Sequence, residues 1–485
     1  MGAPPFETPV TPQAAPTIPV RSSDLLAHGA AAVDAVALER RHGNTDLFAI
    51  LDLLDLAGPF QLESPWELRD QTGRHLIHAG GFAASPFGEA YPPLVEFARS
   101  YLSDTRQLGF PHQTASEWRA ALDAALVALL ASVAPSHADS EVFLSNSGAE
   151  AVEAAMKLAL AYRPKARRFV NFAGAYHGKT LGALALTSSD VYQGPFRPLR
   201  ETITLPYGDE DALAGALGKD ADDIAAIVVE PVLGEGGVVP PPPGFLRRLG
   251  ELAASHGVPV IADEVQTGLG RAGHWFASVA DGLEPDIVTL AKPLGGGLLP
   301  VGATIARREI FKAMLPGTAS RRHSSTFGGG SFASAVALRS LELLVDERLD
   351  LRAQELGKRG LERMRDAVER FPHLFAEARG AGMLMAFTLR PIVGFPVPGV
   401  PADDVQAVTS LLALRQLHEA GVHACFSLRG NYILRFTPPL NMPQALFDEM
   451  FDRVDAFAEA NPRSLKLLQR FGLPRLMRLL KVAYG

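Results

Sequence analysis

Between residues 141 and 291 the sequence alternates short apolar runs of β-type residues with longer stretches of helical periodicity. This alternation predicts an α/β fold in which a mainly parallel sheet is covered by helices on both faces. Open sheets of this kind bind ligands at the carboxyl ends of their strands. The apolar runs cover residues 141–145, 168–172, 224–229, 258–262 and 286–291, and the clearest helical stretches cover residues 149–162 and 245–255.

The chain is long enough for two or three domains. Its 485 residues, 47% of them hydrophobic and 20% charged, have the composition of an ordinary globular protein. We predict a flexible Pro-rich tail followed by two folded domains and a terminal helix. The segments are the tail (1–20), an N-terminal segment that joins the small domain (21–90), a large domain (91–335), a smaller α+β domain (336–462) and a basic amphipathic helix (463–485).

Local patterns predict further elements outside the alternating region. Residues 67–82 are typical of a β-hairpin that turns at Thr72 and Gly73. Helical patterns cover residues 23–37, two stretches of 91–130 interrupted at 109–113, a long stretch past residue 335, and residues 403–419 and 444–459. Further strands are predicted near residues 382–389, 422–427 and 432–437.

Charge and composition narrow the class of protein. A net charge of -7 argues against a nucleic-acid partner, which needs a basic face. Cys425 is the only cysteine, so no disulfide can form within the chain. The first residues lack the pattern of a signal peptide, and no apolar run approaches the length of a membrane span. We therefore expect a cytoplasmic protein without a membrane partner.

The predicted C-terminal helix, residues 463–485, is strongly basic. It holds six Lys or Arg residues and no acid, mixed with leucines at helical spacing. A helix of this kind can lie on a membrane surface. More often such a helix docks its apolar side on its own protein or on a partner subunit.

Lys292 is the candidate for a covalent centre. It ends the apolar run of residues 286–291 and is followed by Pro293 and by three glycines, residues 295–297. The lysine would therefore emerge at the carboxyl end of a buried strand. A lysine in a water-poor pocket loses its charge more easily, and a neutral amine can form a Schiff base with a carbonyl. The alternative is a surface lysine in a glycine-rich turn.

The junction at residues 143–150 predicts a phosphate site. It joins a strand to a helix, and the free amides of Gly148 and Ala149 at a helix start, with Ser147 beside them, favour a phosphate dianion. Ser147 is also followed three residues later by Glu150, which is the pattern of a capping box. The two interpretations are compatible, because the capping box leaves backbone donors available.

Carboxylates follow two other predicted strands. Glu235 lies in a glycine-rich loop after residues 224–229. It could pair with an arginine there, or it could be an exposed loop acid. Asp263 and Glu264 come straight after a buried strand, which is costly unless a cation meets them. A protonated ring nitrogen would be such a cation. A metal site is the alternative, but no His or Cys lies at ligand spacing nearby, so we predict no metal.

Three more residues could contact a ligand. Tyr176, in the run YHGKT, could stack on a flat cofactor or pack in the core. Thr326 lies in a polar turn with spare donors. Arg435 lies in a strand that stops at two prolines, where it could fork onto a carboxylate or face solvent.

Residues 268–273 match the G-x-G-x-x-G dinucleotide fingerprint literally. In that fingerprint the glycines form the turn between a strand and a helix, whereas here residues 263–267 come between. The two acids in that interval would repel a pyrophosphate. A nicotinamide oxidoreductase that uses these glycines is therefore a weaker hypothesis. No G-x-S-x-G elbow occurs, so an α/β-hydrolase would lack its nucleophile.

Six motifs together resemble the class III aminotransferases, which are pyridoxal phosphate (PLP) enzymes of fold type I. They occur in the family's order across residues 141–330, and the runs ARGAGMLMAF (378–387) and ILRFTPPL (433–440) extend the resemblance through the small domain. The motifs are SNSGAEAVEAAMKLA, AYHGKTLGALALT, VVEPVLGEGGVVPPPPGFL, IADEVQTGLGRAG, LAKPLGGGLLPVGA and STFGG.

The resemblance implies a role for each matching residue. Lys292 would be the Schiff-base lysine and Asp263 the partner of the pyridine nitrogen. Tyr176 would stack on the cofactor ring, with Gln266 near its hydroxyl. The other cofactor-binding residues would be Ser147, Gly148, Ala149 and His177, with Thr326 contributed by a second subunit of a homodimer.

The resemblance also implies the reaction. The freed lysine would move a proton between substrate and cofactor as a general base and then acid. Glu235 and Arg435 would be the switch pair of the ω-aminotransferases. The motifs are most similar to the putrescine and ornithine branch, which implies transfer of a terminal amino group from a putrescine, ornithine, lysine or 4-aminobutyrate type donor to a keto acid such as 2-oxoglutarate. A racemase or aminomutase on the same fold is the alternative.

One stretch departs from the family. Where a Gly-His commonly stands, within residues 80–89, this chain has Gly88 and Glu89. In the family this loop lies near the substrate mouth. The departure therefore bears on the identity of the substrate more than on the chemistry.

Overall fold

The computed structural model describes residues 19–104, 109–110, 114–196, 200–392, 402–426 and 432–484. The chain divides into two units. One comprises residues 1–60 with 474–485, and the other comprises residues 61–473. The five segments predicted from the sequence stay a prediction, and the tail proper, residues 1–18, lies outside the described residues.

The first unit is made of short helices. The single helix predicted over residues 23–37 is wrong, because α1 ends at His28, Gly29 adopts a positive φ of 53°, and a new helix starts after Asp34. The Asp34 carboxylate caps that helix by accepting from the amide of Ala37 at 2.9 Å. The helices are α1 (Ser22–His28), α2 (Ala35–His42), α3 (Thr45–Leu53) and α18 (Leu473–Tyr484).

The basic C-terminal segment is two helices and not one. Helix α17 (Leu465–Phe471) ends at Gly472, whose φ of 83° is incompatible with continuing the helix, and α18 follows. Within the first unit, Arg475 of α18 pairs with Asp55 at 2.9 Å and Leu479 is buried. Helix α18 therefore packs on its own chain, as one of the two sequence interpretations expected.

A seven-stranded sheet organises the second unit. Only β10 runs against the others, since it pairs antiparallel with β4 and β9 while β9, β8, β7, β5 and β6 pair in parallel. This confirms the predicted mainly parallel sheet. In spatial order the strands are β4 (Glu141–Ser145), β10 (Gly302–Ala306), β9 (Ile287–Leu290), β8 (Val260–Asp263), β7 (Ile224–Val229), β5 (Arg168–Phe172) and β6 (Thr202–Leu205).

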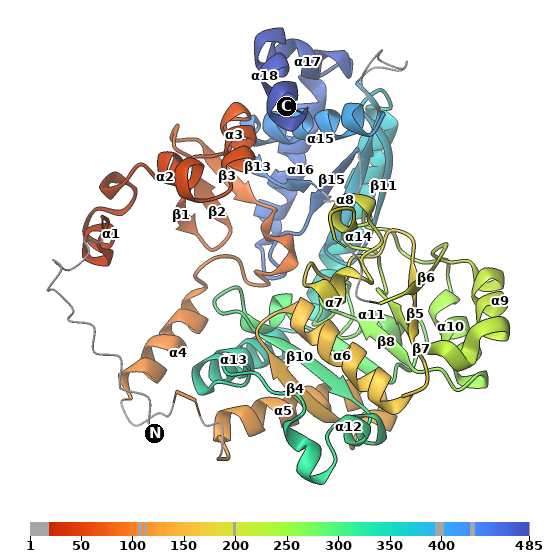
Figure 1. The fold of residues 1–485 in the computed structure, drawn as a ribbon. Coiled ribbons are helices and arrows are strands. Elements are labelled where there is room, and N and C mark those ends of the chain that lie inside the picture. The colour runs from red at the N-terminus through yellow and green to blue at the C-terminus, as the bar shows by residue number, and fades with distance from the viewer. Residues whose placement is uncertain are drawn as a thin grey trace, which may run out of the picture. The chain divides into compact units, whose positions relative to one another are not determined.

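Helices cover both faces of this sheet, so its strands are apolar on both sides (Figure 1). Val228 of β7 packs in one cluster with α6 (Gly148–Tyr162) and α12 (Arg308–Met314), while its neighbours Ile227 and Val229 pack in the other cluster. The second cluster includes α9 (Glu210–Asp220) and α10 (Phe245–Ser255). Burial on both faces explains why the strands are continuous apolar runs in the sequence.

Two four-stranded sheets complete the second unit. The predicted hairpin is confirmed: Arg69 pairs with His75, and Gly73 takes the turn with a φ of 81°. The orders are β1 (Gln61–Ser64), β2 (Glu67–Arg69), β3 (His75–His78), β13 (Val422–His423), and β11 (Phe375–Ala381), β12 (Leu384–Leu389), β15 (Ile433–Phe436), β14 (Cys425–Phe426). The strand predicted over 422–427 is thus two short strands in different sheets, and residue 427 lies outside the described residues.

The remaining helices mostly match the predicted ranges. The long helix expected past residue 335 is two, because Arg348 adopts the left-handed conformation between α13 and α14. Within the described residues no helix is both long and apolar enough to span a membrane. The helices are α4 (Pro92–Ser103), α5 (Glu117–Ala131), α7 (Leu181–Leu184), α8 (Asp190–Gln193), α11 (Ala277–Ala280), α13 (Ser331–Asp346), α14 (Leu349–Arg370), α15 (Ala402–Glu419) and α16 (Gln444–Glu459).

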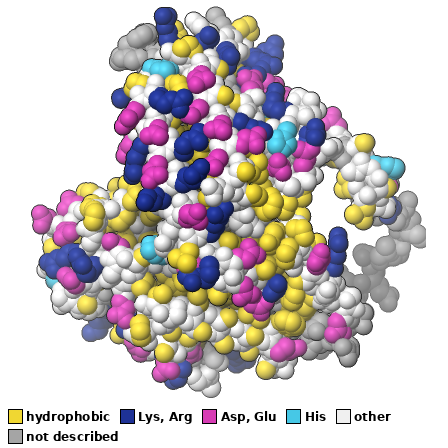
Figure 2. Space-filling model, turned by 180° about the vertical axis from the view of Figure 1, so that it is seen from behind, with side chains coloured by type: hydrophobic (Ala, Val, Ile, Leu, Met, Phe, Trp, Pro, Cys, Tyr) yellow, Lys and Arg dark blue, Asp and Glu magenta, His cyan; other side chains and the backbone are white. Residues whose placement is uncertain are grey.

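Surface charges of both signs are interspersed (Figure 2). On α14 and α16 they form a ladder of ion pairs, with distances of 2.5 to 2.8 Å. The pairs are Arg359–Asp448, Arg363–Asp452 and Arg370–Asp455. Exposed pairs of this kind contribute little to the free energy of unfolding, and they weaken in salt. They stabilise the packing of the two helices and provide no reactive group.

Candidate active site

A recess of about 190 Å³ lies at the carboxyl ends of the parallel strands. Each of five strands, β4, β5, β7, β8 and β9, delivers at least one residue to it through the segment that follows the strand. The lining residues are Gly148, Ala149, Tyr176, His177, Gly178, Lys179, Glu230, Asp263, Val265, Gln266, Ala291 and Lys292. The position agrees with the edge at which open α/β sheets bind their ligands.

Lys292 lies in this recess immediately after β9. Its turn is fixed because the Ser340 hydroxyl donates to the carbonyl oxygen of Pro293 at 3.1 Å. Gly296 follows in the left-handed conformation, with a φ of 65°, where a Cβ would lie 2.4 Å from Leu94. Burial lowers the pKa of the Lys292 ammonium, although the carboxylate of Glu235 opposes this. The amine is therefore easier to neutralise than a surface lysine.

Asp263 ends β8 and is fixed by three hydrogen bonds. Its Oδ1 accepts from the amide of Val265 and the hydroxyl of Thr289, both at 3.1 Å, and its Oδ2 lies 2.6 Å from His177 Nδ1. Burial lowers the pKa of His177, but the hydrogen bond to Asp263 and the charges of Asp263 and Glu230 together outweigh burial, so the net shift is upward. His177 is thus the hydrogen-bonding partner of this buried carboxylate, and its raised pKa favours the protonated ring.

The neighbouring carboxylate, Glu264, is satisfied differently. It is fully buried and accepts from the amide and hydroxyl of Ser278, both at 2.7 Å, and from the Thr267 hydroxyl at 2.5 Å. It does not line the recess. Among the described residues no cluster of His, Cys, Asp or Glu has the geometry of a metal site.

The start of α6 forms one wall of the recess. Within the described part of the chain, the amides of Gly148 and Ala149 have no acceptor. A Cβ at Gly178 would lie 2.6 Å from Ala149, so the loop after β5 approaches the helix start as closely as only glycine permits. Two free amides at the positive end of a 15-residue helix fit a phosphate dianion.

Ser147 caps the same helix. Its hydroxyl accepts from the amide of Glu150 at 3.2 Å, as in a capping box. The return bond is displaced by one residue, because the Glu150 carboxylate accepts from the amide of Asn146 at 2.6 Å. Ser147 itself is exposed beside the helix start, so capping does not remove it from a ligand's reach.

Tyr176 and Gln266 also line the recess. Burial raises the pKa of the Tyr176 phenol to about 12, which keeps the ring neutral. With its amide oriented to satisfy both cations, Gln266 accepts from Lys292 Nζ at 3.0 Å and from Arg435 Nη1 at 3.2 Å. Gln266 thereby connects the lysine to the arginine.

Glu235 and Arg435 form a buried ion pair. Arg435 Nη1 lies 2.5 Å from Glu235 Oε1, and the exposed fractions of the two residues are 0% and 3%. The sequence had left open an exposed loop acid and a solvent-facing arginine, and neither interpretation holds. The ring of Phe82 lies 5.2 Å from the Arg435 guanidinium carbon, a contact for which the sequence gave no signal.

Glu230 is a recess residue to which the sequence analysis assigned no role. Its carboxylate accepts from the amides of Tyr176 at 2.8 Å and Gly234 at 3.0 Å. Burial raises its pKa to about 7, against the effect of His177 and these amides. The sequence did offer one signal for this residue, because Glu230 is an acid that directly follows a fully apolar strand, β7.

Thr326 does not reach the recess of its own chain. It is exposed and lines a separate cavity of about 560 Å³ with residues that include Arg119, Phe143 and His323. The structure therefore brings together every predicted cofactor-binding residue except Thr326, with Ser147 beside the recess and not in its lining.

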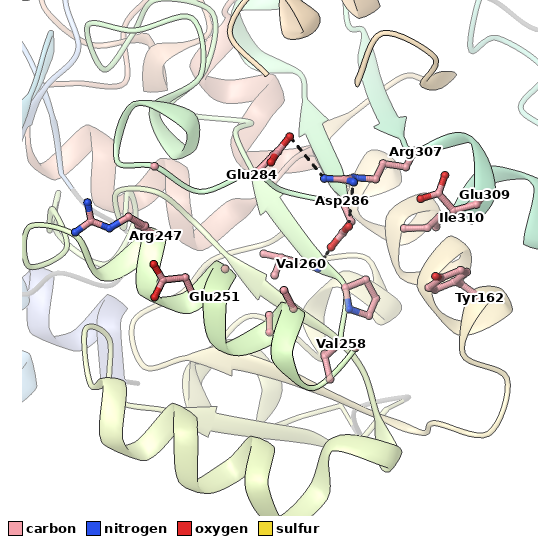
Figure 3. Close-up of a pocket in the computed structure, with 16 residues that line it drawn as sticks. Tyr162, Arg247, Glu251, Val258, Val260, Glu284, Asp286, Arg307, Glu309 and Ile310 are labelled. Carbon is pink, nitrogen blue, oxygen red and sulfur yellow. Dashed lines mark hydrogen bonds and ion pairs between the residues drawn. The ribbon is translucent and has the colours of Figure 1, made fainter. Parts of the chain in front are cut away.

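A third cavity, of about 510 Å³, borders the opposite edge of the sheet (Figure 3). Residues that precede β8 and β9 contribute to its lining, and two of its acids, Glu284 and Asp286, lie at ion-pair distance from Arg307. Arg307 lies 3.4 Å from Asp286, and Asp286 also accepts from the amide of Val260 at 2.8 Å. The larger hollow thus lacks the combination of groups found around Lys292.

The glycines of residues 268–273 form a compact turn and do not start a helix. The amide of Gly268 donates to the carbonyl oxygen of Glu264, and the amide of Leu269 donates to that of Trp275. The next helix, α11, begins at Ala277 and has four residues. These glycines therefore lack the strand-turn-helix context of a dinucleotide site.

Comparison with known protein families identifies the family to which this chain belongs. Residues 65–457 match the family model described as aminotransferase class-III, which is most of the chain. The chain belongs to the class III aminotransferases. This class III aminotransferase is therefore a PLP-dependent enzyme of fold type I.

Solved structures give the same result. An ornithine aminotransferase from Toxoplasma gondii is 26% identical, with a TM-score of 0.73 over 85% of this chain and 92% of that one. An amine transaminase from an uncultivated Pseudomonas species, in its PLP-bound form, is 26% identical, with a TM-score of 0.74 over 83% and 94%. An acetylornithine aminotransferase from Elizabethkingia anophelis is 28% identical, with a TM-score of 0.71 over 87% and 98%.

Proposed function

We propose that this class III aminotransferase transfers the terminal amino group of a diamine or ω-amino acid to a keto acid such as 2-oxoglutarate. The donors considered are of the putrescine, ornithine, lysine or 4-aminobutyrate type. The observation that carries the proposal is the buried Glu235–Arg435 pair, connected to Lys292 through Gln266. The likeness to an ornithine aminotransferase and to an amine transaminase supports it.

The recess residues divide the chemistry among them. PLP, when bound, supplies an electron sink for the carbanion formed at the substrate carbon. The Ser147 hydroxyl and the amides of Gly148 and Ala149 would hold its phosphate, and Asp263 would keep a proton on its ring nitrogen. Lys292 would bind the cofactor covalently and, when released, carry the proton as general base and acid. Its lowered pKa favours the base form.

The ion pair would let one site accept two kinds of substrate. While Arg435 pairs with Glu235, the recess offers no free guanidinium, so an amine without a nearby carboxylate fits. When the pair opens, Arg435 can make a bidentate hydrogen bond to the carboxylate of a keto acid. The exchange is feasible because the incoming carboxylate replaces the lost one, which avoids leaving a buried unpaired charge.

Arg435→Ala is expected to weaken the keto acid half-reaction by about 100-fold and the diamine half-reaction by less than about tenfold, because only the keto acid needs the guanidinium. Single-turnover rates with putrescine, ornithine, lysine, 4-aminobutyrate and β-alanine, and separately with 2-oxoglutarate, measure both halves. Arg359→Ala, which removes a surface arginine of α14, is the control. Equal losses in both halves, or no turnover with any terminal amine, would contradict the proposal.

We also propose that the enzyme is a homodimer in which Thr326 completes the partner's site. Thr326 is exposed and lines a cavity separate from its own recess. Beside it the rings of Phe327 and Phe110 form an edge-to-face pair, although each is more than half exposed. Exposed aromatic side chains of this kind are enriched in protein interfaces. A two-fold dimer would place the same surface of each chain on the other.

Mixing two inactive variants tests this arrangement. Lys292→Ala removes the lysine, and Thr326→Asp places a negative charge against the phosphate. In a mixed dimer one site has both intact residues, so random mixing should restore roughly a quarter of wild-type activity. Light scattering should give the mass of two chains. A monomeric mass, or no recovery after the chains have exchanged, would rule out a shared site.

A further inference from the structure

Arg271 is a buried cation that has no acidic partner among the residues that the structure describes. It is 0% exposed, and within the described residues its Nε and Nη2 have no hydrogen-bond acceptor. Burial alone lowers its pKa to about 9. An arginine held in this way costs free energy, and a chain keeps it only if the guanidinium contributes something in return.

One nitrogen of the Arg271 guanidinium makes the hydrogen bonds that could offset this cost. Arg271 Nη1 donates to the carbonyl oxygen of Pro438 at 2.6 Å and to that of Met383 at 3.2 Å. The main chain supports the contact, since the amide of Met383 donates to the carbonyl oxygen of Arg271 at 3.0 Å. Both acceptors are backbone atoms, so Arg271 fixes chain segments and not side chains.

Those two segments flank Arg435. Met383 immediately precedes β12, and Pro438 follows β15 three residues after Arg435. The strands are neighbours, with Ala386 opposite Arg435. Arg271 therefore holds β15 at its carboxyl end, and that contact does not depend on the position of the Arg435 guanidinium.

Arg271 itself belongs to a segment that carries catalytic groups. Arg271 lies in the loop after β8; this loop carries Gln266 and directly follows Asp263, the last residue of that strand. This loop is compact, because the amide of Ala272 donates to the carbonyl oxygen of Thr267. It also touches the turn before β12 so closely that a Cβ at Gly382 would lie 2.5 Å from Ala272.

We propose that Arg271 is a positioning residue that holds β15 against this loop when Arg435 has left Glu235. The inference rests on the switch role proposed for Arg435. While the Glu235–Arg435 pair is closed, that pair and Gln266 also hold the strand in place. When the pair opens to receive a keto acid, those contacts are lost and the backbone contact of Arg271 remains. Arg271 should therefore matter in the keto acid half-reaction and little in the diamine half-reaction.

Two variants of the full-length holoenzyme test this. Arg271→Met keeps an unbranched side chain but removes every donor, and should raise the 2-oxoglutarate concentration for half-maximal single-turnover rate by about tenfold. The diamine half-reaction should change by less than about threefold. Arg271→Lys should stay within about threefold of wild type in both halves, because one ammonium can donate to both carbonyl oxygens.

The outcomes separate this inference from the proposed function. If Arg435→Ala acts on the keto acid half while Arg271→Met weakens both halves equally, Arg271 is merely structural and the inference is wrong. If Arg435→Ala weakens both halves equally, the switch itself is wrong, whatever Arg271 does. If Arg271→Met does not fold, Arg271→Lys alone decides the test. A loss of rate in Arg271→Lys that is well beyond threefold and equal in the two half-reactions would overturn the positioning role.

Discussion

Lys292→Ala is expected to reduce transamination by at least about 10⁴-fold, because one side chain supplies both the covalent attachment and the proton transfer. In the structure the amine lies in the recess with a lowered pKa, and it donates to the side-chain amide of Gln266, which cannot accept a proton from carbon. Single-turnover kinetics with an active donor would measure the loss. Borohydride reduction followed by peptide mass analysis should fix the cofactor to residue 292 in wild type and to no residue in the variant.

Lys179→Ala is the matched control. Lys179 also lines the recess, but it is exposed and its ammonium lies 4.3 Å from the centre of the Tyr192 ring. Its loss should leave covalent attachment intact and change turnover by less than about tenfold, since an exposed cation–π contact contributes only about 0.5–1 kcal/mol. Covalent attachment that survives in Lys292→Ala and disappears in Lys179→Ala would show that the lysine was assigned wrongly.

The parallel strands were predictable because both faces of the sheet are buried. All six residues of β7 are buried, so its run of apolar residues is continuous in the sequence. β10 gave no such signal: it begins with Gly302 and pairs antiparallel with β4 and β9, and no local pattern specifies strand direction. The breaks at Gly29 and Arg348, both of which adopt a positive φ, also escaped prediction.

The candidate site was predictable where each residue follows its own strand. Asp263 and Lys292 stand directly at strand ends, and parallel strands bring such ends together. The contact between Glu235 and Arg435 joins residues 200 positions apart, so spacing could not predict it, and only the family resemblance implied it. The Phe82 contact and the buried state of Glu230 depend on tertiary packing, which a single sequence does not reveal.

Asp263→Asn is expected to slow both half-reactions by roughly 10³-fold, the size of effect seen when a preorganised electrostatic partner is lost. The amide keeps the volume of the carboxylate and can still accept from Val265 and Thr289. It loses the negative charge that would keep a proton on the ring nitrogen. It also loses the charged partner of His177, whose pKa should fall, because the effect of burial is then opposed by Glu230 but no longer by the charge of Asp263. Titration of the His177 ring by NMR would report that fall independently of turnover.

The adjacent carboxylate supplies the control for Asp263→Asn. Glu264→Gln changes an equally buried acid of the same loop, but its partners are Ser278 and Thr267 and it does not line the recess. It should lower the melting temperature and leave the single-turnover rates within about tenfold of wild type, because hydrogen bonds to a buried charge contribute about 1.5–3 kcal/mol to stability. If the two variants lost activity to the same extent, the charge of Asp263 would have no special part in the chemistry. A large loss of activity in Asp263→Asn alone, together with a lowered His177 pKa, would show that the two neighbouring buried acids have different roles. Asp263 would polarise the site, and Glu264 would hold the loop.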